Sequence, residues 1–206
     1  MRLVLARHGQ TGANVRGALD TGLPGYPLTD EGHRQAAELA ERLATEPVVA
    51  VYASHAVRAQ QTARPVAVAH GLDVALLDGV HEAFAGDLEG SDDLEQRGLW
   101  QDVYRAWHTG ELDRAVPGGE SGEQVLRRYL ADVDRVRVTH PHGTVVLVSH
   151  GAALRLAACA LAPNVEGAFA WVHYLPNTAT VLLERDGATA GWRCLRWHDV
   201  DLPAAR

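Results

Sequence analysis

The sequence predicts an α/β domain built in layers around a mainly parallel sheet, and two observations support this prediction. Short runs rich in β-branched residues, without polar alternation, are typical of strands covered on both faces; the clearest are 2–6, 48–52 and 144–148. Stretches with apolar residues at helical spacing separate these runs. An alternation of strands and helices favours a parallel sheet with helices on its faces.

Four helices are expected, at 29–45, 56–69, 121–138 and 152–161. The first has the plainest start signal, because Thr29 is a capping side chain and two acids, Asp30 and Glu31, follow it. Three further strands are expected, a weaker one at 73–77 and a pair at 178–184 and 191–197 around a turn at Asp186-Gly187.

Residues 84–120 interrupt the alternation of strands and helices. They are rich in Gly, Asp and Trp, and we expect a helical excursion over one edge of the sheet. No linker or repeat divides the chain, so a single domain spanning residues 1–206 is expected. The tail after Asp199 is expected to be loose.

Composition excludes several classes of protein. The chain is 47% hydrophobic and 22% charged, and 19 basic against 26 acidic residues give a net charge of −7. Such an acidic chain is not expected to bind nucleic acid or an anionic membrane, so an anion must meet a local basic pocket. Two isolated cysteines, a short apolar start and no apolar run of roughly 20 residues predict a cytoplasmic protein without a disulfide framework.

Two predicted strands end in the same way, with a His-Gly pair. His8 follows the strand at 2–6, and His150 follows the strand at 144–148. Ligands in open α/β sheets bind at the carboxyl ends of strands, near helix N-termini that favour anions. A single histidine after a strand is most often structural, but two in this position, one preceded by Arg7, predict that both face one pocket.

Two more polar residues stand at matching places. Arg58 falls in the first turn of the expected helix at 56–69, where the helix dipole disfavours a cation and a bound anion would compensate. Glu82 follows the expected strand at 73–77. Taken singly, each residue is more often simply solvated, so the prediction depends on the set as a whole.

This set suits phosphoryl transfer. Arginines grip phosphate oxygens with forked donors, and His8 offers a nitrogen nucleophile that is largely neutral near pH 7. A protonated His150 could donate to the transferring group, and a protonated Glu82 could give its proton to the leaving alkoxide. Two arginines and a protonated histidine can supply the charge stabilisation without a metal.

A metal site fits the pattern less well. His8 follows Arg7, and a cation beside a ligand opposes the binding of a second cation. No His-Glu-x-x-His or His-x-His pattern accompanies the histidines that follow strands, and His140-Pro141-His142 is expected in a surface loop. We therefore expect no metal and no cofactor.

The chain resembles the histidine phosphatase superfamily, the phosphoglycerate mutase-like enzymes, in six blocks that occur in the family's order over residues 2 to about 185. The blocks are Arg7-His8-Gly9-Gln10-Thr11-Gly12-Ala13-Asn14; Asp20-Thr21 with Pro27-Leu28-Thr29-Asp30-Glu31-Gly32; Ser54 to Ala63; Glu82, Gly86 and Glu89-Gly90; Pro117-Gly118-Gly119-Glu120-Ser121; and Val148-Ser149-His150-Gly151 with Arg155. Asn177-Thr178 also resembles the family's entry to a late strand.

The resemblance implies a fold and a reaction. The fold would be a three-layer sandwich with a mixed, mainly parallel sheet flanked by helices, and a small helical cap from 84–120. The reaction would be metal-independent hydrolysis of a small phosphorylated metabolite, with a homodimer left open. Carried over by position, His8 attacks phosphorus and is phosphorylated, while Glu82 protonates the leaving group and then helps to activate water.

The resemblance also assigns binding roles. Arg7, Arg58 and His150 would hold the equatorial phosphate oxygens. Asn14 matches a position in the phosphate pocket, and Thr21 would line the substrate mouth. The need for a protonated acid in the first step predicts an acidic pH optimum.

Two alternatives remain at this stage. Cofactor-dependent mutases carry a Glu-Arg-His-Tyr-Gly stretch around the acid where this chain has Glu82-Ala83-Phe84-Ala85-Gly86, which favours hydrolysis over a phosphoglycerate mutase or mutase–phosphatase. A non-catalytic phosphate-binding module would normally have lost the nucleophile or an arginine. The specificity is expected in the cap, where Trp100, Tyr104 and Trp107 share one helix face that is more often core than substrate wall.

Overall fold

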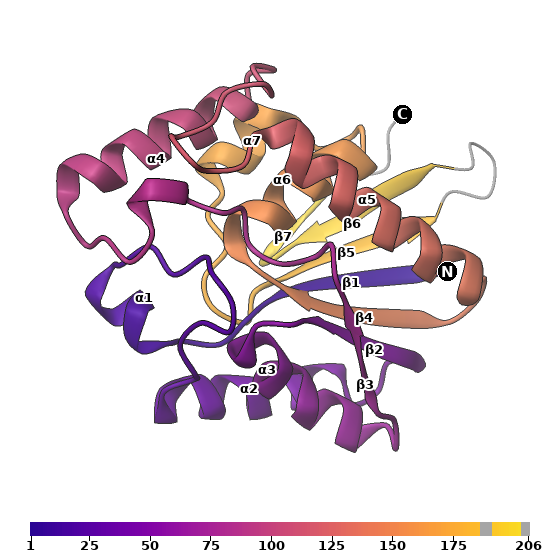
Figure 1. The fold of residues 1–206 in the computed structure, drawn as a ribbon. Helices are drawn as coiled ribbons and strands as arrows, with labels where there is room; N and C mark the ends of the chain where they lie inside the picture. The colour runs from indigo at the N-terminus through magenta and orange to yellow at the C-terminus, as the bar shows by residue number, and fades with distance from the viewer. Residues whose placement is uncertain (186–190, 203–206) are drawn as a thin grey trace.

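The computed structural model describes residues 1–185 and 191–202, and its central element is a seven-stranded sheet in the order β3-β2-β4-β1-β5-β6-β7 (Figure 1). The strands are β1 (Arg2–Arg7), β2 (Val48–Ser54), β3 (Val74–Leu77), β4 (Thr144–Ser149), β5 (Thr180–Arg185), β6 (Trp192–Trp197) and β7 (Val200–Asp201). Strands β3, β2, β4 and β1 are parallel, whereas β5, β6 and β7 continue the sheet with antiparallel pairings. The sheet is therefore mixed, as the resemblance implied.

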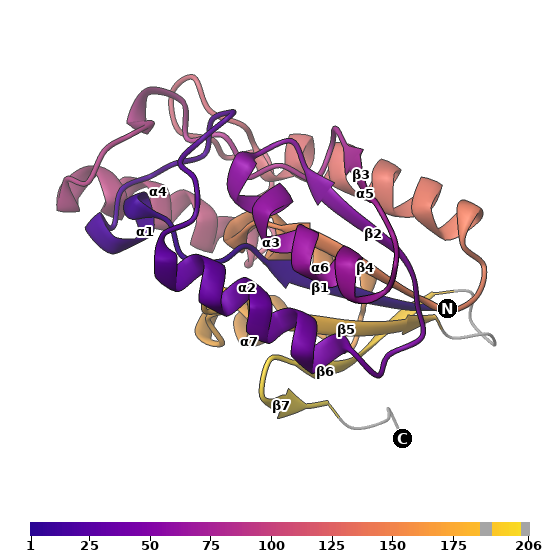
Figure 2. The same ribbon diagram turned by 90° about the horizontal axis from the view of Figure 1, so that it is seen from below.

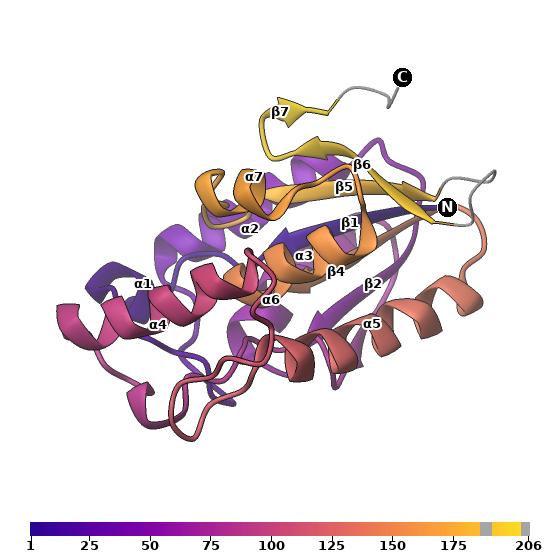
Figure 3. The same cartoon turned by 90° about the horizontal axis from the view of Figure 1, so that it is seen from above.

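Helices cover both faces of this sheet. They are α1 (Gly12–Arg16), α2 (Asp30–Leu43), α3 (Val57–Ala69), α4 (Leu94–Trp107), α5 (Gly122–Thr139), α6 (Gly151–Leu161) and α7 (Gly167–Val172), with a short 3-10 turn at Gly86–Leu88. Helices α2 and α3 lie on one face (Figure 2), and α5, α6 and α7 lie on the other (Figure 3). The three-layer fold is thus confirmed.

Strand β1 shows why the two faces have separate cores. Leu3 and Leu5 pack into the core beneath α5 and α6, while Val4 and Ala6 pack into the core beneath α2 and α3. Successive side chains of a strand point to opposite faces, so a run without polar residues feeds both layers. All four of these side chains are buried.

The expected helices are present with small shifts at their ends. The Thr29 hydroxyl accepts a hydrogen bond from the Gly32 amide at 3.0 Å, which confirms the predicted cap of α2. The short helices α1 and α7 were not expected, because a helix of five or six residues leaves too little periodicity to detect.

The excursion at 84–120 contains the 3-10 turn and α4, and its described residues contribute no strand to the sheet. The expected turn at Asp186-Gly187 lies outside the described residues. The expectation of a loose tail after Asp199 is wrong for residues 200–201, because these pair with β6 as β7. Among residues 1–185 and 191–202, no helix combines the length and the apolarity needed to cross a bilayer.

Candidate active site

The two His-Gly pairs meet at one end of the sheet. Strands β1 and β4 are parallel neighbours with Arg7 opposite Ser149, so the residues that follow them, His8 and His150, lie side by side. Their ring centroids are 5.2 Å apart, and the His8 amide donates to the Ser149 carbonyl at 3.0 Å. The predicted convergence of the two histidines is confirmed.

The surroundings of His8 leave one ring nitrogen open. Its Nδ1 lies 2.7 Å from the Gly9 carbonyl oxygen, and because a carbonyl only accepts, Nδ1 must carry the proton. Burial, together with the charges of Arg58 and Arg7, holds the pKa of His8 well below its usual range. The imidazole is therefore neutral, and the lone pair resides on Nε2.

His150 is also neutral in this environment, which corrects the expectation of a protonated ring. Burial lowers its pKa well below the usual range, and the nearby charge of Arg58 adds to that effect. Its Nε2 lies 2.6 Å from the Ser54 hydroxyl, while its Nδ1 is buried without a partner in the described part of the chain. If Ser54 donates to Nε2, a neutral His150 still presents an Nδ1–H donor.

Arg58 is 1% exposed, so the solvated alternative does not hold. It lies in the first turn of α3, and the anion beside it is Asp20 of the same chain. An Nη1 donates to the Asp20 carboxylate at 3.2 Å, and Nη2 donates to the Asp20 carbonyl at 2.9 Å. This pairing gives each outer nitrogen one partner and leaves the buried Nε without a partner among residues 1–185 and 191–202.

Arg7 is held from the opposite side. Its Nη1 donates to the Tyr174 hydroxyl and to the Leu175 carbonyl, the latter at 2.8 Å. Its guanidinium lies 5.2 Å from the centre of the Tyr174 ring. The Arg7 Nε is buried and has no partner among the described residues. A buried donor without a protein partner that lies beside a polar cavity is suited to bind an anion.

Glu82 binds the N-terminus of α6 with its carboxylate. Oε1 accepts from the amides of Ala83 and Ala153, both at 2.9 Å, and Oε2 accepts from the Ala152 amide at 3.0 Å. The helix terminus that was expected to bind a substrate anion is thus partly occupied by this side chain. These three hydrogen bonds fix the position of the carboxylate at the start of the helix.

Asn14 and Thr21 both line the site, but their free groups differ. The Asn14 Oδ1 accepts from the Thr11 amide and from Asn177 Nδ2, each at 3.1 Å, so its own Nδ2 faces the pocket. The Thr21 hydroxyl donates to Glu89 and accepts from the Ala85 amide at 2.9 Å. Thr21 therefore forms part of the cavity wall, but its hydroxyl is already engaged in hydrogen bonds within the protein.

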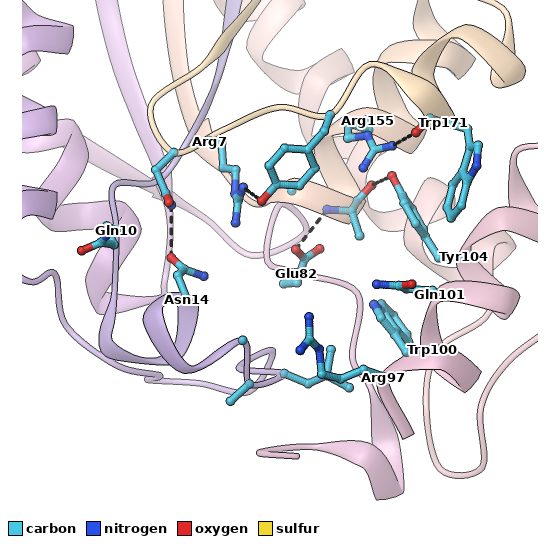
Figure 4. Close-up of a pocket in the computed structure, with 17 residues that line it drawn as sticks. Arg7, Gln10, Asn14, Glu82, Arg97, Trp100, Gln101, Tyr104, Arg155 and Trp171 are labelled. Atoms are coloured by element: carbon cyan, nitrogen blue, oxygen red, sulfur yellow. Dashed lines mark hydrogen bonds between the residues drawn. The ribbon is translucent and has the colours of Figure 1, made fainter. Parts of the chain in front are cut away.

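Two adjoining cavities share Arg7, Glu82 and Trp100. The smaller, of about 150 Å³, also reaches His8 and Arg58. The larger, of about 530 Å³, extends toward α4 and the segment after α7 (Figure 4). The smaller cavity is polar and suits a tetrahedral anion, and the larger one can receive the group attached to that anion.

The aromatic stripe of α4 divides between core and pocket. Trp100 and Tyr104 line the larger cavity, although both are largely buried. Trp107 does not line it; the indole N–H donates to the Arg114 carbonyl at 2.8 Å, and the ring packs edge-on against Tyr104. The expectation of a core stripe therefore holds fully only for Trp107.

The sequence did not predict the residues that hydrogen-bond to the predicted site residues and fix their positions. Asp20 and Ser54 stood in recognisable blocks but had no role assigned, and Tyr174 stood in no block at all. Tyr174 reaches Arg7 from 167 positions away, a contact that no local pattern announces.

Comparison with known proteins agrees with this geometry. The model of the histidine phosphatase superfamily (branch 1) matches residues 3–200. Phosphoserine phosphatase 1 of Hydrogenobacter thermophilus is 32% identical over 161 residues, which are 78% of this chain and 76% of that protein. A metal-independent phosphoserine phosphatase of Arabidopsis thaliana is 33% identical over 156 residues, 74% of this chain and 65% of that protein.

A solved structure also matches this chain in its fold. The mycobacterial glucosyl-3-phosphoglycerate phosphatase, in a complex with VO3, matches with a TM-score of 0.84 at 26% identity, covering 97% of this chain and 99% of that one. The fold is α/β, and its site is a polar cavity lined by two arginines beside a buried imidazole. The chain belongs to the histidine phosphatase superfamily, branch 1, and its phosphatase relatives identify it as a phosphoric monoester hydrolase.

Proposed function

We propose that this protein is a metal-independent phosphomonoesterase that acts on a small phosphorylated metabolite through a phosphohistidine at His8. The observation that carries the proposal is the open Nε2 of a neutral, buried His8 beside the two arginines Arg7 and Arg58. A plant relative is itself named metal-independent, which supports the same chemistry here. Arginines supply the positive charge that a metal provides in other phosphatases.

In the first step the Nε2 lone pair of His8 attacks phosphorus, and the bond from phosphorus to the ester oxygen breaks. The departing oxygen takes a proton from Glu82. Arg7, Arg58 and the Nδ1–H of His150 stabilise the equatorial oxygens, and their unpaired buried nitrogens gain partners. Asn14 adds a donor through its free Nδ2, and Thr21 holds the wall beside it.

In the second step water attacks the phosphohistidine. The water gives a proton to the Glu82 carboxylate, the bond from phosphorus to nitrogen breaks, and inorganic phosphate leaves. Glu82 must be protonated at the start of each cycle, and its carboxyl group is held by three backbone amides. An acidic optimum for kcat/KM follows from that requirement.

The test is phosphate release from p-nitrophenyl phosphate in EDTA between pH 4 and 9. We expect turnover that His8→Ala reduces by at least ~1000-fold, since the nucleophile is lost. Stopping the wild-type reaction in base should trap a phosphoenzyme that acid hydrolyses, and His8→Ala should trap none. Turnover that survives in His8→Ala would show that the nucleophile is assigned wrongly.

The same preparation separates hydrolysis from mutase activity. Incubation with 3-phosphoglycerate and the bisphosphate should release free phosphate. Accumulation of the 2-phospho isomer would indicate a mutase instead. Absence of phosphate release from every ester, with phosphate still bound, would indicate a non-catalytic binding module.

A further inference from the structure

Glu89 ends the short 3-10 turn Gly86–Leu88, and the mechanism proposed above does not use it. Its carboxylate nevertheless binds three donors of the segment 19–22. Oε1 accepts from the amides of Thr21 and Gly22 at 2.8 and 3.0 Å, and Oε2 accepts from the Thr21 hydroxyl. A carboxylate that accepts three hydrogen bonds from two adjacent residues holds them in one arrangement.

The backbone joins the same two segments a little earlier in the chain. The Gly90 amide donates to the Leu19 carbonyl at 2.7 Å, and the Leu19 amide donates to the Ser91 carbonyl at 2.9 Å. These bonds fix the residue before Asp20, while the bonds to Glu89 fix the two residues after it. The backbone of Asp20 is therefore held from both sides.

Asp20 in turn orients Arg58. The Asp20 carboxylate accepts from one outer nitrogen of the guanidinium at 3.2 Å, and the Asp20 carbonyl accepts from the other at 2.9 Å. The two side chains are 10% and 1% exposed, so water competes little for these bonds. Because one residue holds both outer nitrogens, the direction of the guanidinium depends on where Asp20 lies.

Glu89 stands at the outer end of this chain of contacts. It is exposed, whereas Asp20, Thr21 and Arg58 line the smaller cavity. An exposed carboxylate contributes little to the buried core, so the protein should fold without it. Its hydrogen bonds are directed at the segment that carries Asp20, and any effect on the cavity must pass through that segment.

From this arrangement we infer that Glu89 is a positioning residue for phosphate binding: it fixes the segment 19–22, so that Asp20 holds the Arg58 guanidinium toward the phosphate. The inference rests on the proposed phosphomonoesterase function, because it concerns the cavity in which the phosphate of that reaction binds. Glu89 itself touches neither the substrate nor the reacting atoms. Its loss should weaken the binding of phosphate without removing any group that contacts phosphate.

The experiment separates the position of the Glu89 carboxylate from its charge. Glu89→Asp keeps the charge but is one methylene too short to reach the same donors, Glu89→Gln keeps the length and an acceptor oxygen, and Glu89→Ala removes both. The readouts are the Kd of inorganic phosphate, from titration calorimetry, and kcat/KM for p-nitrophenyl phosphate. Asp92→Ala is the matched control, because Asp92 is an exposed acid on the same segment.

We expect Glu89→Ala to raise the Kd of phosphate about 10-fold and to lower kcat/KM by a similar factor. Glu89→Asp should behave in the same direction, whereas Glu89→Gln and Asp92→Ala should stay close to the wild-type values. Removal of a negative charge near the cavity would by itself tighten the binding of an anion. Weaker binding in Glu89→Ala therefore reports a loss of position.

A double-mutant cycle identifies the group through which Glu89 acts. In an Arg58→Met background, the guanidinium that Glu89 is inferred to position is absent. Adding Glu89→Ala to that background should therefore change the Kd and kcat/KM by less than about 2-fold.

Two results would overturn the inference: a Kd of phosphate in Glu89→Ala that equals or falls below the wild-type value, or losses from Glu89→Ala and Arg58→Met that simply add. A purely structural role would lower the free energy of unfolding, measured by chemical denaturation, and leave the Kd unchanged. If Glu89→Ala does not fold, Glu89→Asp decides in its place. If the wild-type protein hydrolyses no ester, the phosphatase function is wrong, while the phosphate titrations still test Glu89.

Discussion

The phosphate pocket and the loop that carries the acid, residues 79–84, differ in how their polar groups are satisfied. In the pocket, Arg7 Nε, Arg58 Nε and His150 Nδ1 are buried without partners in the described residues. In the loop, five of the six carbonyls, those of Gly79, Val80, His81, Glu82 and Phe84, accept hydrogen bonds. Open donors suit the anion pocket that we propose, whereas a loop that holds one carboxylate in place needs its carbonyls bonded.

Arg128 of α5 explains the order of the loop. Its Nη1 donates to the carbonyls of Gly79 and His81 at 2.6 and 2.8 Å, and its Nη2 donates to the Glu82 carbonyl at 3.0 Å. Its remaining donors form a two-point pair with the Glu120 carboxylate, each at 2.8 Å. All five N–H groups of the guanidinium are used, so Arg128 is a positioning residue for Glu82.

The largest expected effect tests the role of the loop. Glu82→Gln should reduce kcat/KM for alkyl phosphates by about 100- to 10,000-fold, because an alkoxide leaves poorly without a proton. The loss with p-nitrophenyl phosphate should be much smaller, because nitrophenolate leaves unassisted. Steady-state kinetics on both esters provide the measurement, and equal losses would contradict a proton-donating role.

A second change loosens the loop without touching the acid. Arg128→Met should lower kcat about 10-fold, with a smaller effect on KM, because Glu82 loses its fixed position while the phosphate pocket is intact. Three carbonyls and a half-buried Glu120 lose their partner, so the free energy of unfolding should fall by about 2 kcal/mol.

The control for Arg128→Met is Arg127→Met, because Arg127 is its exposed neighbour on α5. A purely structural role would lower stability but leave the pH profile of the surviving activity unchanged. A positioning role should also change the pH profile of kcat, because the proton transfer from Glu82 is disturbed. Unchanged kcat and pH profile in Arg128→Met would remove this residue from the mechanism.

The smallest effect concerns His108. Like the donors of the pocket, its two ring nitrogens are buried without partners in the described chain. Unlike them, His108 lines neither of the two cavities, so it separates the effect of burial from that of the pocket. Burial lowers the pKa of His108 to about 4, and the charge of Arg155 adds to this. Between pH 6.5 and 4 the unfolded chain therefore binds a proton at this position that the folded chain does not bind. The free energy of unfolding consequently decreases as the pH is lowered.

His108→Leu removes this titration. The free energy of unfolding of the wild-type protein should fall by about 1 kcal/mol more than that of the variant between pH 7.5 and 5.5. Above pH 7 the difference between the two should be constant. Chemical denaturation at a series of pH values measures it, and identical slopes would show that His108 is not held neutral.

Local signals in the sequence were enough for strands β1 to β6, for helices α2, α3, α5 and α6, and for the meeting of the two histidines. A polar-free strand ending in His-Gly occurs twice, and the topology of parallel strands then implies that His8 and His150 meet. The start of the helix at 29–45 was predicted from the capping residue Thr29. These features depend on residues adjacent in the chain, which is why they could be predicted.

Contacts between distant segments were decided only by the tertiary structure. Examples are the pairing of Arg58 with Asp20, the support of Arg7 by Tyr174 and the five bonds of Arg128. The partners in these contacts are separated by between 8 and 167 positions in the sequence. The neutral state of His150 likewise depends on what surrounds it in space. A sequence specifies which groups are present, but burial and the nearest charges, which determine protonation and pairing, exist only once the chain has folded.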